Sequence, residues 1–159
     1  MNDVLELLDS KKIKYDLVEH EEVHTIEDMQ KLGLLDMGYV CKNLFLRNAN
    51  GKMNFVLSCH HSKEIDLKSI EKKIGSTRLS FGSSERLDKF LKLSQGYVSP
   101  FGVINDESKS VIFIFDKDIV NECKVGFHPN INTATVFVAF KDIKKIIEDH
   151  GNDVVLIKL

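Results

Sequence analysis

The sequence predicts an α+β fold in which a mixed, curved β-sheet is flanked by helices. Short apolar strand patterns alternate with amphipathic helix patterns along the whole chain. An Asn-Gly hairpin signal at residues 50–51 also joins two consecutive strand patterns. Because hairpins interrupt the regular alternation of strand and helix, we expect this mixed sheet rather than a parallel, doubly wound one.

The N-terminal part of the chain predicts a helix, a strand and a second helix. Residues 2–12 carry apolar side chains at helical spacing, and residues 15–18 resemble a short strand. Thr25 followed by Asp28 is typical of a helix N-cap with an acidic residue in the first turn. We expect this helix to end at Gly33.

The middle of the chain predicts a β-hairpin followed by a capped helix. Two strand patterns, residues 39–47 and 53–59, are joined by the turn at residues 48–51. Asp66 is placed to cap the next helix, which we expect to end at Gly75.

Three further elements complete the middle of the chain. A short strand is expected at residues 79–81, and Ser83 or Ser84 is placed to cap the helix that follows. The continuous apolar run at residues 111–115 predicts a buried strand, and Asp116 begins a short helix or turn.

The C-terminal part predicts a strand, a helix and a final strand. The strands are expected at residues 133–140 and 154–157, and Gly151 ends the helix between them. The sequence contains no linker, repeat or low-complexity segment, so we expect residues 1–159 to form a single domain. A domain of this size buries roughly two-thirds of the surface of its unfolded chain.

Composition and charge limit the possible functions. No apolar run approaches the ~20 residues that span a bilayer, and the N-terminus is acidic and helix-like, so we expect a cytoplasmic protein without a membrane partner. The 22 basic and 24 acidic residues give a net charge of −2. This balance argues against a non-specific DNA or RNA coat but allows recognition of one end of a tRNA.

One basic cluster could serve as a phosphate-binding patch. Its members alternate with acidic residues, however, so we favour a solvated helix face. The cluster comprises Lys63, Lys68, Lys72, Lys73 and Arg78.

Cysteine and histidine spacing predicts neither a metal site nor a cofactor. The three cysteines are far apart and form no Cys-x-x-Cys pair, so we expect them to be reduced and packed in the interior. His60 and His61 lack a third ligand at metal spacing. His20 and His24 are four residues apart, but the capping signal at Thr25 favours a loop, where His24 is a candidate for the mouth of a pocket.

The segment from Gly126 to Val136 is the most informative stretch of the chain. Pro129 restricts the backbone of His128 to an extended conformation and so holds the imidazole at a defined angle. Asn132 and Thr133 supply short polar side chains before a β-branched strand. A simple turn with a surface histidine would explain the same local sequence.

Two other segments favour a functional site. Lys42 and Asn43 stand at the entrance of the apolar run Leu44-Phe45-Leu46. A Gly-x-x-x-Pro unit runs from Gly96 to Pro100, and its glycine permits close approach of the backbone to a ligand.

Taken in order, these segments resemble the YbaK/ProX family of aminoacyl-tRNA deacylases, which includes the editing domain inserted in bacterial prolyl-tRNA synthetase. The resemblance spans nearly the whole chain and implies a mixed, partly barrel-like sheet. The His128-Pro129 pair and the Asn132-Thr133-Ala134-Thr135 run are most similar to the free-standing branch that removes alanine from mischarged tRNA(Pro). A cysteinyl-tRNA(Pro) deacylase of the same family and a non-catalytic binding module are the alternatives.

The resemblance also implies roles for individual residues. Lys42 and His128 are the candidate catalytic residues: the ammonium would offset charge at the ester or terminal phosphate, and the imidazole would orient water, accept from the substrate's amino group or shape the pocket. The candidate substrate-binding residues are Asn43, Gly96, Ser99, Pro100, Phe101, Gly102, Asn132 and Thr133. The acceptor end of tRNA(Pro) is the expected partner, with prolyl-tRNA synthetase as a candidate second partner.

Overall fold

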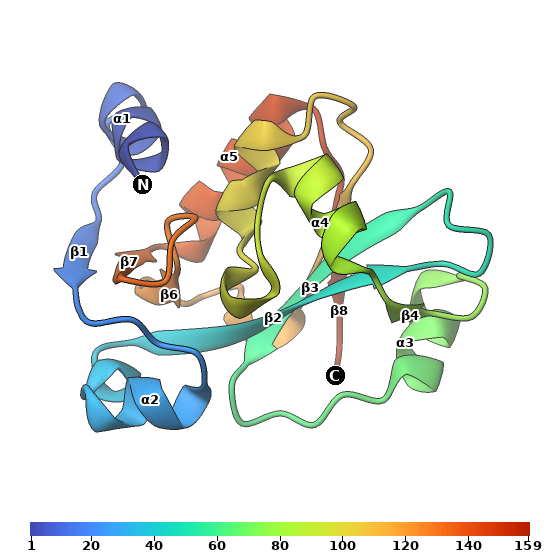
Figure 1. Cartoon of the computed structure of the whole chain (residues 1–159), viewed down its shortest axis with the longest axis horizontal. Coiled ribbons are helices and arrows are strands. Elements are labelled where there is room, and N and C mark those ends of the chain that lie inside the picture. The colour runs from blue at the N-terminus through green and yellow to red at the C-terminus, as the bar shows by residue number, and fades with distance from the viewer.

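The computed structural model describes residues 1–159 and contains the predicted mixed sheet with helices on both faces (Figure 1). No helix in it is both long enough and apolar enough to cross a membrane. The α-helices are α1 (Asn2–Ser10), α2 (Ile26–Lys31), α3 (Leu67–Ile74), α4 (Ser84–Leu91) and α5 (Phe140–His150). The strands are β1 (Asp16–Glu19), β2 (Tyr39–Arg47), β3 (Asn54–His60), β4 (Ser80–Phe81), β5 (Ile112–Asp116), β6 (Val125–Phe127), β7 (Ala134–Val138) and β8 (Val154–Ile157).

The β2–β3 hairpin forms the centre of the sheet. Its strands are antiparallel, whereas β5 lies parallel to β3 and β8 lies parallel to β5. On the other side, β6 is parallel to β2, and β7 and β1 continue the sheet with antiparallel pairing. The strand order is β1-β7-β6-β2-β3-β5-β8, with β4 paired to β2, so the sheet is open and does not close into a barrel.

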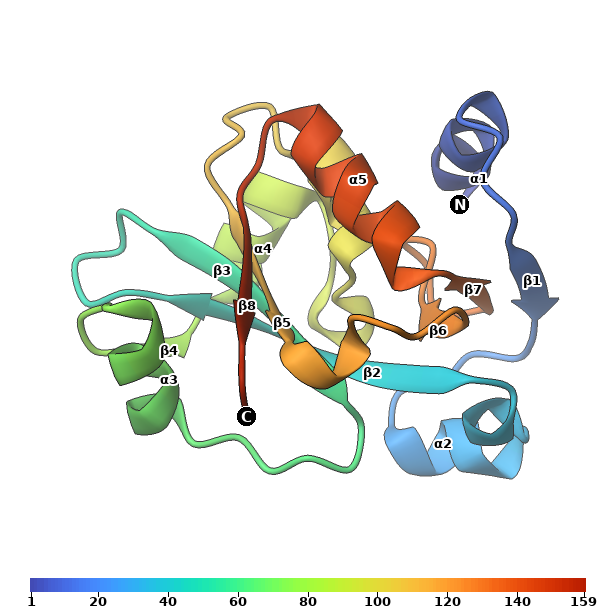
Figure 2. The same ribbon diagram turned by 180° about the vertical axis from the view of Figure 1, so that it is seen from behind.

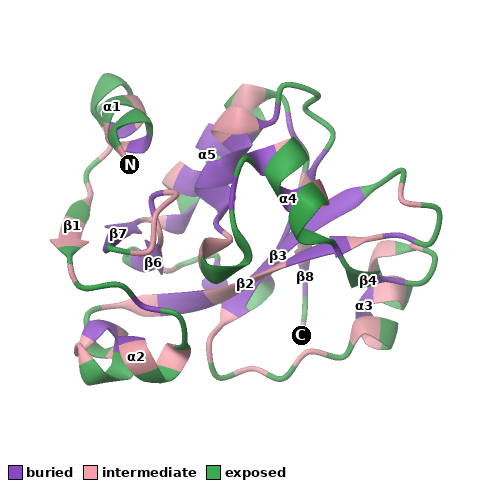
Figure 3. Cartoon of the chain, in the orientation of Figure 1, coloured by how far each residue is buried: buried purple, intermediate pink, exposed green.

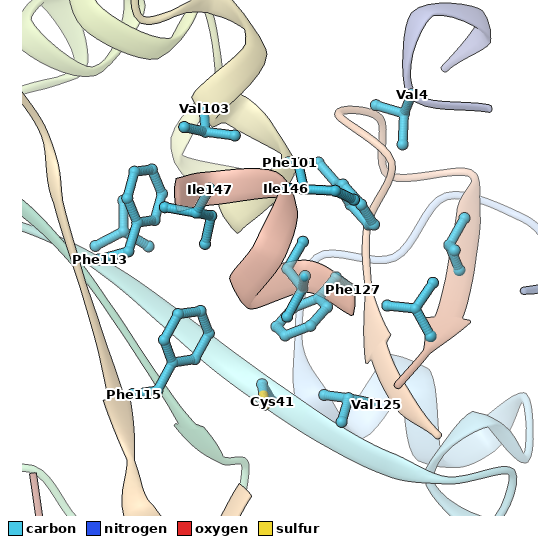
Figure 4. Packing of buried hydrophobic residues seen from close by; sticks show 14 of the residues in the cluster. Val4, Cys41, Phe101, Val103, Phe113, Phe115, Val125, Phe127, Ile146 and Ile147 are labelled. Carbon is cyan, nitrogen blue, oxygen red and sulfur yellow. The ribbon is translucent and has the colours of Figure 1, made fainter. Parts of the chain in front are cut away.

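Apolar side chains form a separate core on each face of the hairpin. The larger core joins α1, α4 and α5 to the sheet, and Phe113 and Ile147 belong to it (Figures 2 and 4). On the opposite face, Ile70 of α3 packs with Leu46 and Leu57. A third, smaller cluster joins α2 to β2 and β7. The central strands are consequently buried along most of their length, while the outer faces of the helices are exposed (Figure 3).

The predicted helix caps are confirmed. Thr25 and Asp28 form a reciprocal capping box at α2, and the Asp66 carboxylate and the Ser83 hydroxyl accept from backbone N–H groups at the starts of α3 and α4. Gly75 ends α3 with φ of +68°, a conformation that glycine adopts without steric cost.

Two features of the structure differ from what the sequence predicted. The short strand β6 was not predicted, because three residues are too few for a periodic pattern to be recognised. Cys41 and Cys59 are reduced and buried as expected, but Cys123 is exposed and packs in no core.

Candidate active site

A pocket of about 160 Å³ lies where α2, β2 and the 3₁₀ turn η2 (Gln95–Tyr97) meet. In Figure 1, α2 lies below β2, and the olive loop that contains η2 passes in front of the strand. Four of the predicted site residues line this pocket: Lys42, Asn43, Gly96 and His128.

The floor of the pocket is a stretch of β2 that has no strand beside it on one edge. On this edge β6 pairs with residues 39–40 of β2, and β4 pairs with residues 46–47. The intervening residues 41–45 face the gap between the two short strands. The sheet topology thus leaves part of a central strand accessible to a ligand.

The peptide groups of Asn43 point into this gap. Odd-numbered residues of β2 direct their N–H and C=O groups to this edge, because the Tyr39 N–H donates to the Lys124 carbonyl at 2.8 Å and the Phe45 carbonyl accepts from the Gly82 N–H at 2.9 Å. Asn43 follows the same alternation. Its side-chain oxygen accepts from the Ser58 hydroxyl at 2.5 Å, which fixes the side chain against β3.

His128 is mostly buried and its neutral tautomer is defined by one contact. The ring Nδ1 lies 2.9 Å from the Ala134 carbonyl oxygen, and because a carbonyl only accepts, Nδ1 carries the hydrogen. The other ring nitrogen, Nε2, is then an acceptor in the neutral ring. Burial lowers the pKa of His128; the Ala134 contact opposes this shift, and the charge of nearby His20 adds to it.

The segment that carries His128 is tied back to the rest of the site. The Thr133 carbonyl accepts from the His20 N–H at 2.9 Å, and the His20 Nε2 lies 2.9 Å from the Thr135 hydroxyl. The His20 and His128 rings meet edge to face with centroids 6.2 Å apart. These contacts hold the His20 ring against the His128 ring.

Lys42 lies at the pocket with its ammonium bound to a neighbouring loop. Nζ donates to the carbonyl oxygen of Lys63, in the loop between β3 and α3. The charge of Lys42 also lowers the pKa of His61, after the larger contribution of burial and that of His60. Since an ammonium has three hydrogens, this contact leaves donors free for a substrate.

The Gly-x-x-x-Pro loop divides into two parts. Gly96 lines the pocket, and a Cβ added there would meet only the His24 Nδ1, at 3.9 Å. Ser99, Pro100, Phe101 and Gly102 are all buried in the core instead. The Ser99 hydroxyl accepts from the Phe101 N–H at 3.2 Å and caps the 3₁₀ helix η3 (Pro100–Asn105). The structure therefore does not bring these four residues to the pocket.

Asn132 and Thr133 lie next to the pocket segments without lining the pocket. The Asn132 side chain donates to the Glu22 carboxylate at 3.1 Å, and its carbonyl accepts from the Val23 N–H at 3.2 Å. They hold the segment before α2 against the His128 segment. A contact of either residue with substrate stays a prediction.

Sequence reasoning missed most of the pocket wall. His24 lines the pocket, as expected for its mouth, but the other residues of the wall were not among the predicted site residues. They are Val23, Thr25, Ile26, Met29, Gln95, Tyr97 and Val98, together with Cys41. The apolar members also suit a helix or strand core, so their pattern carries no signal for a pocket.

The remaining histidines are not arranged as a metal site. The His60 ring meets the Tyr39 ring edge to face with centroids 4.8 Å apart, and its centroid lies 4.2 Å from that of the His61 ring. No group of three or more histidine, cysteine, aspartate or glutamate side chains is placed to hold a metal ion. Burial, with smaller effects of nearby charges, raises the pKa of Tyr39 to about 12, and its buried hydroxyl has no hydrogen-bond partner.

Comparison with known protein families shows which family this chain belongs to. Residues 20–146, which include every pocket-lining residue, match the model of the aminoacyl-tRNA editing domain. The chain belongs to this family. Editing domains hydrolyse the ester between an amino acid and tRNA, so this editing domain is an aminoacyl-tRNA deacylase whose substrate is an aminoacyl-tRNA.

Individual relatives support the same family. The chain is 47% identical over 156 residues to the prolyl-tRNA editing protein ProX of Acetoanaerobium sticklandii, which covers 98% of this chain and 95% of that protein. It is 30% identical over 149 residues to the prolyl-tRNA synthetase associated domain-containing protein 1 of Bos taurus, covering 91% and 86% of the two chains. Among solved structures, a candidate trans-editing enzyme for prolyl tRNA synthetase superposes with a TM-score of 0.72 at 18% identity, covering 99% and 94% of the two chains. That likeness shows the fold of the editing domain.

Proposed function

We propose that this protein edits mischarged tRNA(Pro) in trans, and that alanine is the amino acid it removes. The observation that carries the proposal is the convergence of Lys42, Asn43, Gly96 and His128 on one small pocket beside an unpaired strand edge. The 47% identity to a protein named for prolyl-tRNA editing supports tRNA(Pro) as the substrate.

The proposed reaction is hydrolysis of an activated ester. Water adds to the ester carbonyl carbon, negative charge develops on the carbonyl oxygen, and the bond to the ribose oxygen breaks. The products are the free amino acid and tRNA with its terminal hydroxyl restored. The protein's main tasks are to position the ester, admit the water and stabilise the developing charge.

Two groups at the pocket are suited to the developing negative charge. The Lys42 ammonium retains free hydrogens beside its contact with the Lys63 carbonyl. The Asn43 peptide N–H points into the gap in the sheet and is a donor held in place by the strand. A rigid donor of this kind needs no reorganisation when charge develops.

His128 is proposed to act as a neutral acceptor. With Nδ1 hydrogen-bonded to Ala134, its Nε2 can accept from the attacking water or from the amino group of the substrate. Its lowered pKa keeps the ring neutral at physiological pH, which favours this role over that of a cation.

Selection of alanine over proline is proposed to be steric. Val23, Ile26, Met29 and Val98 contribute apolar wall to a pocket of about 160 Å³. A synthetase pocket rejects an amino acid with fewer carbons by only ~1–3 kcal/mol, so a second pocket that excludes the larger correct amino acid completes the discrimination. Glycyl esters, being smaller still, should be hydrolysed in part.

The test is deacylation of alanyl-, cysteinyl- and prolyl-tRNA(Pro), measured side by side with the wild type and Lys42→Ala. Rapid loss of alanine, little loss of proline and a large decrease in the Lys42→Ala variant are expected. Lys52→Ala is the matched control, because Lys52 is exposed in the β2–β3 turn and makes no ion pair.

Other outcomes would redirect the proposal. Preferential loss of cysteine would keep the family and change the amino acid. Hydrolysis of none of the three esters would contradict the proposed reaction and favour a binding module.

A further inference from the structure

The loop between β3 and α3 connects the pocket to a buried charge. Residues 61–66 form no helix or strand, yet Lys63 makes contacts in two directions. Its carbonyl oxygen accepts from the Lys42 ammonium, and its own ammonium binds the carboxylates of Asp116 and Asp118. One residue therefore links a proposed catalytic group to an ion pair at the end of β5.

The anchor of this link is an ion pair with a buried carboxylate. The Asp116 side chain is completely buried, and the Lys63 side chain is 25% exposed. A buried carboxylate is costly without a cation, so removing Lys63 would leave an unpaired charge. Asp116 is also held by β5, and it accepts from the Asp118 and Leu159 N–H groups at 3.4 Å.

We propose that Lys63 is a positioning residue for editing: its ion pair with Asp116 fixes the loop, so that its carbonyl holds the Lys42 ammonium at the pocket. This inference rests on the proposed function, in which Lys42 is catalytic. A carbonyl is suited to the task because it orients an ammonium without neutralising its charge, whereas a carboxylate in its place would cancel that charge.

An ion pair that only stabilised the fold would not require the Lys63 carbonyl to contact the Lys42 ammonium. The contact between the Lys63 carbonyl and Lys42 joins a loop to the middle of a strand: Lys42 lies on β2 and lines the pocket, and the loop follows β3, which pairs with β2. The exposed member, Asp118, adds a second carboxylate to the same ammonium at 2.5 Å. The loop is thus held by two carboxylates at the point where it meets Lys42.

The decisive experiment is a double-mutant cycle on deacylation under single-turnover conditions with the proposed substrate, alanyl-tRNA(Pro). Lys63→Met should lower the rate constant roughly 10- to 100-fold with little change in substrate affinity, since small misplacements of a reacting group have effects of this size. In the Lys42→Ala background the same substitution should have almost no further effect. Lys63→Arg, which can reach the same carboxylates, should restore most of the rate.

Two controls separate positioning from stability. Lys11→Met breaks the Lys11–Asp149 ion pair, whose atoms lie 3.0 Å apart, and should leave the rate unchanged. Thermal unfolding of every variant shows which of them fold. If Lys63→Met does not fold, Asp118→Asn replaces it in the cycle, because it removes only the more exposed carboxylate of the anchor.

A spectroscopic readout does not depend on activity. In protein labelled with ¹⁵N-lysine, the Lys42 Nζ resonance is assigned by its loss in Lys42→Ala. Lys63→Met should shift or broaden it, and Lys11→Met should not. An unmoved resonance, or a loss of rate that is equal in both backgrounds, overturns the inference. Failure of the wild type to hydrolyse any ester would instead contradict the proposed function, and the Nζ resonance would still test the contact.

Discussion

Gly96 and Gly102 lie in one loop, six positions apart, and have opposite surroundings. A Cβ added to Gly96 would meet only the His24 ring nitrogen at 3.9 Å, which is ordinary contact. A Cβ added to Gly102 would lie 2.7 Å from Leu93 Cδ1 and 3.3 Å from Leu91 Cβ. The first glycine opens the wall of the pocket, and the second permits close packing in the core.

The difference shows that one sequence motif serves two purposes. The first part of the loop, residues 95–98, faces the pocket, whereas the second part, residues 99–102, is fully buried and anchors the first. Phe101 is central to the anchor: it packs edge to face on Phe127 with centroids 6.2 Å apart, next to α5 (Figure 4). Substitutions in the two parts should therefore affect different properties.

The largest effect is expected from Phe101→Ala. The substitution removes a fully buried ring from the main core and should lower the free energy of unfolding by about 3–5 kcal/mol. Denaturant unfolding measures this change. Phe81→Ala is the matched control, because Phe81 is 63% exposed and its loss should change stability little. Equal losses in the two variants would contradict the anchor role.

A smaller loss is expected from Gly102→Ala. The added methyl group would overlap Leu93 and press on Leu91, and overpacking of this kind costs about 1–3 kcal/mol. The same unfolding experiment tests the expectation. An unchanged midpoint would mean that the Leu93 side chain moves aside at no cost.

The sign should reverse for Gly96→Ala. Its backbone does not need the left-handed region and its Cβ has room, so the smaller entropy of the unfolded chain should stabilise the protein by about 0.4–1 kcal/mol. If the wall contacts substrate as proposed, the same variant should raise KM for aminoacyl-tRNA. A destabilised variant would show that the two parts of the loop do not differ.

The smallest effect is expected from protonation of His128, which belongs to the pocket side of this comparison. Burial lowers its pKa below the ordinary value of 6.5, so the unfolded chain takes up the proton first as the pH falls. Its contribution to stability is complete above pH 6.5 and decreases as the pH drops toward the folded-state pKa. Editing that needs the neutral ring should persist below pH 6.5 for the same reason.

NMR titration of the ring protons and unfolding at several pH values measure these effects. His61 also has a lowered pKa through burial, so it contributes with the same sign. Comparison of His128→Gln with His61→Gln separates the two histidines. A folded-state pKa of His128 above 6.5 would contradict the neutral-acceptor role.

Local sequence was enough to predict most elements of the fold. The Thr25 and Asp66 caps, the Asn-Gly turn and the strand at residues 154–157 depend on neighbours in the chain, so their patterns are visible in the sequence. Lys42, Asn43, Gly96 and His128 were predicted through the family resemblance, and the pocket brings them together.

The contacts that position these residues join segments that are distant in sequence. The gap in the sheet exists because β6 and β4 are short and meet opposite ends of β2, and no pattern within β2 reveals that. Ser99 and Phe101 have the same residue types whether they face a ligand or a core, and packing against α5 and β6 buries them. Lys63 resembled a solvated lysine because its acidic partners are 53 and 55 residues away. Chemistry that resides in neighbouring residues can be predicted from a sequence, whereas burial and orientation depend on which distant segments the fold packs together.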